Sequence, residues 1–168
     1  MEPRGLKDEI KKRHAFECPE QEAALNLART ADGFQIEVQR FLKCHGLTGG
    51  QYNVLRILRG EGTELACQEV GARMITQVPD ITRLVDRLEA AGLVERRRTP
   101  EDRRLVLLKI TPSGLDLLNA IDAPILELHR RQLGHFSRDE LVELNRLLVK
   151  ARRAPARRAV NGGSDETS

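Results

Sequence analysis

Arginine side chains are concentrated in one short stretch of the chain, residues 96–104, which reads RRRTPEDRR. The guanidinium group is always charged and carries five donors in a planar fork, so it suits phosphate oxygens and the edge of guanine. The central letters TPED favour a turn. We therefore expect a β-hairpin with strands over 93–98 and 103–110. Its cationic tip could bind a polyanion such as duplex DNA. The candidate DNA contacts in this hairpin are Arg96, Arg98, Arg103 and Arg104, and the alternative is an ordinary solvated surface.

A short amphipathic helix is predicted directly before the hairpin. It begins near Val78 with Pro79 in its first turn, because proline's fixed φ suits that position. Gly92 ends the helix, as glycine enters a left-handed C-cap without steric cost. One face is an apolar stripe at helical spacing, made of Ile81, Leu84, Val85 and Leu88. The opposite face and the helix start supply the candidate DNA contacts Gln77, Pro79, Thr82, Arg83 and Arg87.

Arg83 is the best candidate on this helix for reading a base, because arginine can donate two hydrogen bonds to guanine. The alternative is an ion pair within the helix, with Asp86 or with an acidic neighbour of Arg87. Gln77 and Thr82 either contact bases and phosphates or act as caps and solvated polar groups. A polar helix face beside a cationic hairpin is what a winged helix presents to the major groove and its flanks.

The preceding elements complete a winged module. Thr48 and Gln51 form a capping-box pattern that starts one helix, and a further helix is expected over residues 64–75. The sequence thus predicts a mainly α fold with a small β wing, in which residues 47–111 form a winged helix-turn-helix DNA-binding module.

Long helices are predicted on both sides of this module, over residues 20–46 and 112–153. In the second segment, Thr111 with Pro112 starts one helix and Ser137 with Glu140 another. Each helix has an apolar face that needs a partner, so we predict a helical dimerisation region and a homodimer. Its two recognition helices would lie about one DNA turn apart, roughly 34–36 Å. Residues 1–19 are expected to form an arm and residues 154–168 a disordered tail.

Composition adds limits to this interpretation. The 168 residues carry a net charge of only +3, so local arginine clusters matter more than the total. No apolar run approaches the roughly 20 residues that cross a bilayer, and the N-terminus lacks an apolar signal region. We expect a cytoplasmic protein with no membrane contact. The three cysteines are odd in number and widely spaced, unlike a disulfide framework.

Motifs for catalysis or for cofactors are not found in the sequence. It has no Walker loop, no G-x-S-x-G, no H-E-x-x-H and no dinucleotide fingerprint. The pairs His14 with Cys18 and His129 with His135 lack the tight spacing of a zinc motif. We expect no enzyme, no cofactor and no metal.

The stretch TRLVDRLEAAGLVERR, followed by DRRLVLLKIT and TPSG, resembles the MarR family of bacterial transcription regulators over roughly residues 20–150. The resemblance implies a dimer with six helices and a wing arginine in the minor groove. That role falls on Arg104, with Arg103 beside it, while Asp102 orients an arginine. The family's usual polar residues before the recognition helix are partly replaced by Val78 and Pro79. These two residues can read a base only through apolar contact with a thymine methyl.

The sequence is thus interpreted as a dimeric transcription regulator, a repressor that a small-molecule effector releases from a pseudo-palindromic site on double-stranded DNA. The effector follows from the resemblance alone. Tyr52 either lines a ligand pocket or packs at a helix junction with its hydroxyl bonded. Two alternatives stay open: a winged-helix module for protein contact or assembly, or a redox-switched regulator acting through Cys18.

Overall fold

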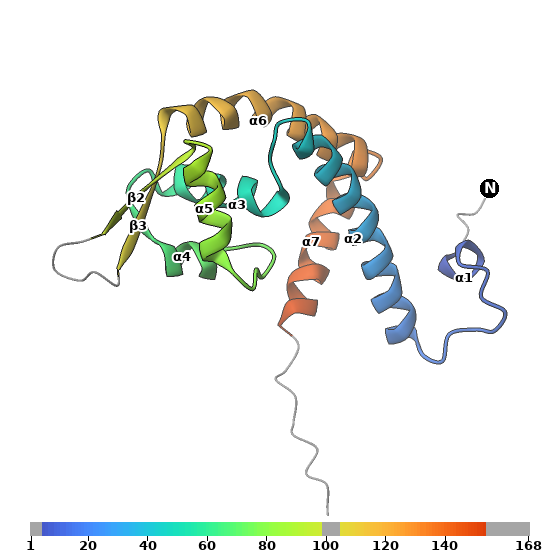
Figure 1. The fold of residues 1–168 in the computed structure, drawn as a ribbon. Helices are drawn as coiled ribbons and strands as arrows, with labels where there is room; N and C mark the ends of the chain where they lie inside the picture. Colours follow the sequence, from blue (N-terminus) through green and yellow to red (C-terminus); the bar gives the residue numbers. More distant parts are fainter. Residues whose placement is uncertain (1–4, 99–104, 154–168) are drawn as a thin grey trace, which may run out of the picture. The chain divides into compact units, whose positions relative to one another are not determined.

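The structure is a computed structural model that describes residues 5–98 and 105–153. The chain divides into two compact units, residues 1–130 and residues 131–168. The first unit begins with α1 (Leu6–Glu9) and α2 (Pro19–Lys43), and α6 (Pro112–Leu133) runs through its end. Between them come α3 (Gly49–Glu61), β1 (Leu65–Ala66), α4 (Cys67–Ala72), α5 (Ile81–Ala90), β2 (Val94–Arg98) and β3 (Val106–Ile110) (Figure 1). The second unit holds α7 (Arg138–Arg152).

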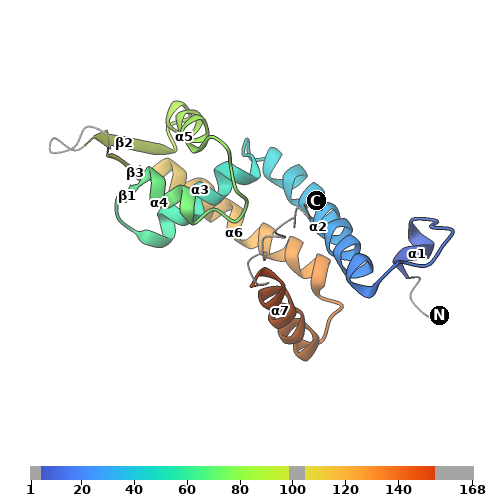
Figure 2. The same ribbon diagram turned by 90° about the horizontal axis from the view of Figure 1, so that it is seen from below.

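The predicted mainly α fold with a β wing is confirmed. Helices α3, α4 and α5 pack against one another and against the small sheet, as Figures 1 and 2 show. Their shared core is fully buried and includes Leu55 and Leu58 of α3, Val85 and Leu88 of α5, and Leu108 of β3. Leu118 and Ile121 of α6 and Leu42 of α2 close the same core from the flanking helices.

The sheet has one strand more than the predicted two-stranded ribbon. β2 and β3 pair antiparallel as expected, with Arg96 opposite Leu108. β1 adds a third strand on the other edge of β3, with Leu65 opposite Leu108. The prediction of a helix over residues 64–75 is therefore wrong at both ends, because Leu65 and Ala66 take ladder hydrogen bonds and α4 covers only Cys67–Ala72. A two-residue strand is too short to show any periodicity in sequence.

The recognition helix α5 begins later than predicted. Its N-cap is Asp80, whose side chain accepts a hydrogen bond from the backbone N–H of Arg83 at 3.0 Å. Pro79 therefore lies before the helix and not in its first turn. Proline restricts the preceding Val78 to extended backbone, and aspartate is a stronger helix start than proline at this position. The predicted end is confirmed, since Gly92 has φ +69° just after the helix.

The predicted caps of the other helices are confirmed. Thr48 with Gln51 and Ser137 with Glu140 both form complete capping boxes. The hydroxyl of Thr111 accepts a hydrogen bond from the backbone N–H of Gly114 and donates one to the carbonyl of Gly92 at 2.7 Å. This threonine thus joins the start of α6 to the turn between α5 and β2, and it fixes the base of the wing.

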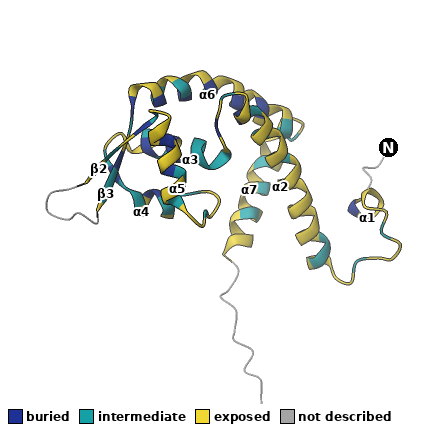
Figure 3. Cartoon of the chain, viewed as in Figure 1, coloured by how far each residue is buried: buried dark blue, intermediate teal, exposed yellow. Residues whose placement is uncertain are grey.

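The burial of α2 changes along its length. Near its C-terminal end, Phe41 and Leu42 pack on the core. Further towards the N-terminus, Leu25, Leu27 and Ile36 are 44%, 52% and 40% exposed, and Figure 3 shows mostly exposed residues there. In the second unit, Val142 of α7 is likewise 62% exposed. The long helices therefore present apolar side chains that the described part of the chain does not cover.

Candidate nucleic-acid interface

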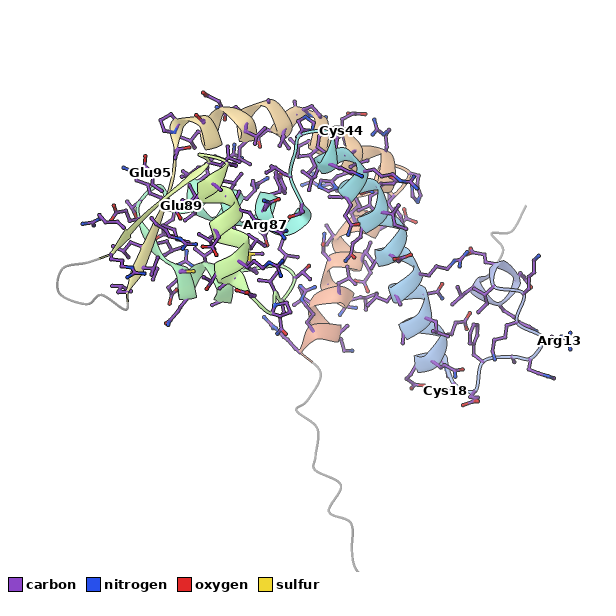
Figure 4. The ribbon with its side chains drawn as sticks, in the orientation of Figure 1. Arg13, Cys18, Cys44, Arg87, Glu89 and Glu95 are labelled. Atoms are coloured by element: carbon purple, nitrogen blue, oxygen red, sulfur yellow. The ribbon has the colours of Figure 1, made fainter. Side chains whose placement is uncertain are left out.

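The recognition helix α5 divides into a buried face and an open face. Val85 and Leu88 are fully buried, while Ile81 and Leu84 pack at the edge of the core. The candidate contacts on the other side, Thr82, Arg83 and Arg87, are all exposed, as are Gln77 and Pro79 in the segment before the helix. Arg87 and Glu89 project from different sides of α5 (Figure 4). The structure thus places all five predicted residues on or beside one accessible surface.

The guanidinium groups of Arg83 and Arg87 are held by no carboxylate of the described residues. Neither guanidinium group makes a hydrogen bond or an ion pair with another described side chain. The alternative of an ion pair between Arg83 and Asp86 is not formed, because the Asp86 carboxylate bonds Arg96 of the wing instead. Both arginines line an open hollow of about 350 Å³ between the starts of α3 and α5, beside Thr48, Gln51, Val78 and Pro79.

The segment before α5 is held to α3 by a hydrogen bond. Asn53 of α3 accepts a hydrogen bond from the backbone N–H of Ile75 at 2.8 Å through its side-chain oxygen. The Ile75 side chain is 89% exposed in spite of its apolar character. Nothing in the sequence pattern marked Asn53 or Ile75, since the hydrogen bond spans 22 residues.

Arg96 of β2 is enclosed by oxygen atoms of the recognition helix. Its Nη2 atom lies 2.5 Å from Oδ1 of Asp86 and donates to the carbonyl oxygen of Thr82 at 3.3 Å. Its Nε atom is inaccessible to solvent and makes no hydrogen bond, although Oε2 of Glu89 lies 3.4 Å away as an ion-pair partner. The side chain is only 24% exposed. The structure therefore gives this predicted DNA contact a set of partners inside the protein, whereas Arg98 two residues further along the strand is exposed.

Arg97 and Glu64 form an ion pair that the sequence did not reveal. The Nη2 atom of Arg97 lies 2.5 Å from one oxygen of Glu64, and Nε donates to the other at 3.2 Å. This pairing lowers the pKa of the Glu64 carboxyl below its ordinary value. The separation of 33 residues explains why spacing alone could not pair them. The remaining predicted wing residues, Asp102, Arg103 and Arg104, lie outside the described residues.

Tyr52 lies on α3 and packs against the core of the first unit. Its ring is half-buried against the core, and its hydroxyl accepts a hydrogen bond from Arg56 at 3.0 Å. The bonded hydroxyl agrees with one part of the packing alternative. The ligand-pocket alternative for Tyr52 stays a prediction.

The cysteines differ in their surroundings. Cys18 is the exposed N-cap residue of α2, and its side chain makes no capping hydrogen bond. Cys44 is the exposed C-cap residue of α2, and its thiol donates to the carbonyl oxygen of Arg40. Burial raises the pKa of the half-buried Cys67 thiol, although the nearby charge of Arg96 opposes this shift. Within residues 5–98 and 105–153, no group of three His, Cys, Asp or Glu side chains is arranged to hold a metal.

No helix among the described residues is long and apolar enough to cross a bilayer.

The helix-turn-helix with its sheet and its open arginine face defines the class as a winged helix-turn-helix DNA-binding protein. Residues 45–105 match the family model described as the MarR family. The repressor IacR of Pseudomonas putida is 30% identical over 122 residues, which cover 73% of this chain and 72% of the relative. The chain belongs to the MarR family of transcription regulators, whose named relatives are regulators and not enzymes.

Solved structures agree with this assignment. A MarR transcription factor from Planctomyces limnophilus is 42% identical, with a TM-score of 0.64 over 81% of this chain and 99% of that one. A mutant of MarR from Escherichia coli, solved in complex with operator DNA, has a TM-score of 0.70 at 23% identity, over 88% of this chain and 99% of that one. At 23% identity, the similarity to the Escherichia coli structure supports the fold alone.

Proposed function

We propose that this chain is a homodimeric repressor that binds a pseudo-palindromic operator through α5 and the wing. One observation carries the proposal: the exposed face of α5 bears two arginines, Arg83 and Arg87, without carboxylate partners among the described residues. Other arginines of the first unit also make described contacts. Most of these arginines pair with a carboxylate, as Arg59 does with Asp122. An α-helix fits the major groove of duplex DNA. Guanidinium groups without a carboxylate partner on such a helix favour binding to a polyanion.

The proposed contacts divide into base reading and phosphate binding. Arg83, in the first turn of α5, donates two hydrogen bonds to a guanine in the major groove. Arg87 and Arg98 bind phosphates and set the register of the helix on the duplex. Gln77 and Thr82 add polar contacts, while Pro79 offers an apolar contact to a thymine methyl. Arg104 enters the flanking minor groove with Arg103 beside it, and Asp102 orients an arginine.

The dimer is supported by the uncovered apolar residues of α2 and α7. Homodimerisation through these helices buries side chains such as Leu27 and Val142, which a monomer leaves in water. A two-fold dimer presents two copies of α5 to successive major grooves, so the operator is an inverted repeat.

A small-molecule effector is proposed to release the repressor from DNA. It acts by binding better to a dimer whose recognition helices no longer match the operator spacing, because a ligand shifts a conformational equilibrium only through such a difference in affinity. This part of the proposal is supported by the family to which the chain belongs.

Selection of binding sites from random duplex DNA at two salt concentrations tests the proposal. Recovery of an inverted repeat with steep salt dependence is the expected result. On that site, Arg83→Ala should relax the preference at one base pair by about 1–3 kcal/mol. Arg98→Ala should weaken all sequences alike and reduce the slope of log K against log salt by about 0.9.

Arg146→Ala on α7 is the matched control, since it removes an exposed arginine that pairs only with Glu143 in the described part of the second unit. Its affinity and salt slope should equal those of the wild type. Binding without an enriched sequence would contradict the operator, and no binding at either salt would favour a module for protein contact.

A further inference from the structure

Arg96 connects the two elements that the proposed function brings to DNA. It stands on β2, the first strand of the wing, and its guanidinium group lies against α5. Its two hydrogen-bond acceptors, Thr82 and Asp86, and its ion-pair partner Glu89 follow one another at helical spacing along one side of that helix. Figure 1 shows β2 running beside α5.

The contact is more than a surface ion pair. Arg96 keeps only 24% of its side chain exposed, and Nε is inaccessible to solvent. It has two carboxylates and a backbone carbonyl within 3.4 Å. A planar guanidinium fork can serve several acceptors in one fixed orientation, which an ammonium group cannot.

Leaving this position for DNA would be costly. Both carboxylates would lose their cation while a phosphate approached, and like charges would then face one another across a short distance. Arg98, on the same strand and with its side chain open to solvent, meets no such obstacle. The geometry therefore favours Arg96 as a support and Arg98 as a contact.

We propose that Arg96 is a positioning residue that locks the wing strand to the recognition helix, so that both elements meet DNA as one rigid body. Arg96 then acts on affinity through Arg98 and the strand that carries it, and it makes no DNA contact itself. The inference rests on the proposed function and revises the expectation that Arg96 binds DNA.

A double-mutant cycle on the selected operator tests this role. In the wild type, Arg98→Ala should cost about tenfold in affinity, the worth of one charge-assisted hydrogen bond. Arg96→Gln should cost at least as much. In the Arg96→Gln background, Arg98→Ala should cost less than about twofold, since the strand is already misplaced and non-additivity marks residues that act together.

Footprinting gives an independent readout. Arg96→Gln should lose protection at the flanks of the operator and keep it at the central grooves that α5 occupies. Arg96→Lys should restore part of the affinity, because it keeps one ion pair to Asp86 but not the full set of acceptors. Arg59→Gln is the matched control, as it removes a paired, partly buried arginine of the same unit without touching α5 or the wing.

Independent, multiplicative losses for Arg96→Gln and Arg98→Ala would overturn the inference while leaving the proposed function intact. If Arg96→Gln does not fold, Glu89→Gln removes one of the two carboxylates that face Arg96 and should show the same non-additivity with Arg98→Ala at a smaller loss. A wild-type protein that selects no DNA would overturn the proposed function, and the inference with it.

Discussion

At the scale of single residues, arginines of the first unit differ in whether a carboxylate already holds them. A sequence shows where arginines stand, but it does not show pairs such as Arg97 with Glu64, whose partners come from distant segments. Arg97 is 33 residues from Glu64, and Arg59 is 63 residues from Asp122. Spacing could nominate Arg83, Arg96 and Arg98 alike, and only the fold separates the enclosed Arg96 from the open Arg83.

The pair of Arg59 and Asp122 predicts a pH dependence of stability. Two hydrogen bonds of 2.7 Å from Arg59 lower the pKa of the Asp122 carboxyl. A lowered folded-state pKa adds stability above the unfolded-state value of about 3.9, and this stability is lost as pH falls through the folded value. Asp122 is 38% exposed, so solvent screening limits the contribution to about 0.5–1 kcal/mol.

Urea unfolding of the wild type and Asp122→Asn between pH 6 and pH 3 measures this contribution. The wild type should be more stable at pH 6, and the difference should shrink as the pH falls, because a protonated aspartate resembles asparagine. All other carboxylates are shared by both proteins and cancel. A difference that stays constant over this range would show that the pair adds no pH-dependent stability.

Gly114 predicts a steric limit at the start of α6. A Cβ atom there would overlap the carbonyl oxygen of Leu93 and lie 2.8 Å from Cγ1 of Ile110. Since the first of these atoms belongs to the backbone, Gly114→Ala should destabilise the protein by about 1–3 kcal/mol in urea unfolding. Gly60→Ala in α3 is the control, because nothing lies within 4 Å of its Cβ position and alanine favours a helix by up to about 1 kcal/mol. Equal stability of the two variants would refute the steric account.

At the scale of elements, periodicity and caps located most helices, while pairing between distant residues escaped prediction. The apolar stripe of α5 and the boxes at Thr48 and Ser137 are local signals, and all are confirmed. β1 escaped because two residues carry no period, and their state depends on β3 more than forty positions later. The start of α5 was misplaced because Pro79 and Asp80 both mark helix starts, and the aspartate side chain prevails.

The cap of α5 predicts different effects for two substitutions of Asp80. Asp80→Ala removes the acceptor for the Arg83 N–H and should cost about 1 kcal/mol of unfolding free energy. Asp80→Asn keeps an acceptor, so its stability should stay close to that of the wild type. It also removes a negative charge beside Arg83 at the proposed interface, so operator affinity should rise by about twofold to fivefold at low salt. Thermal unfolding and titration of labelled operator measure both effects, and an unchanged or lower affinity of Asp80→Asn would place this residue away from phosphate.

At the scale of the whole molecule, the apolar side chains of α2 continue along the helix beyond the part that packs on the core. Phe41 and Leu42 pack on the winged module, yet Leu27 lies about four helical turns earlier and is 52% exposed. One chain thus builds more apolar helix surface than its described residues cover. A second copy of the chain is the proposed cover, and self-association is therefore tied to the function of the winged module.

The final prediction links this surface to DNA binding. Leu27→Glu places a charge on the uncovered stripe of α2 and should weaken self-association, which sedimentation over a range of concentrations measures. Since Leu27 makes no part of the core, the monomer should keep its helical content by circular dichroism. Its affinity for an inverted repeat should fall to that for a single half-site, because two linked recognition helices gain affinity from binding together.

Ile75→Glu is the matched control for self-association, since it adds the same charge at an apolar residue that is 89% exposed in the winged module. A Leu27→Glu protein that remains dimeric would exclude this stripe as the dimer contact, and a monomer with undiminished affinity for the full repeat would separate dimerisation from operator binding.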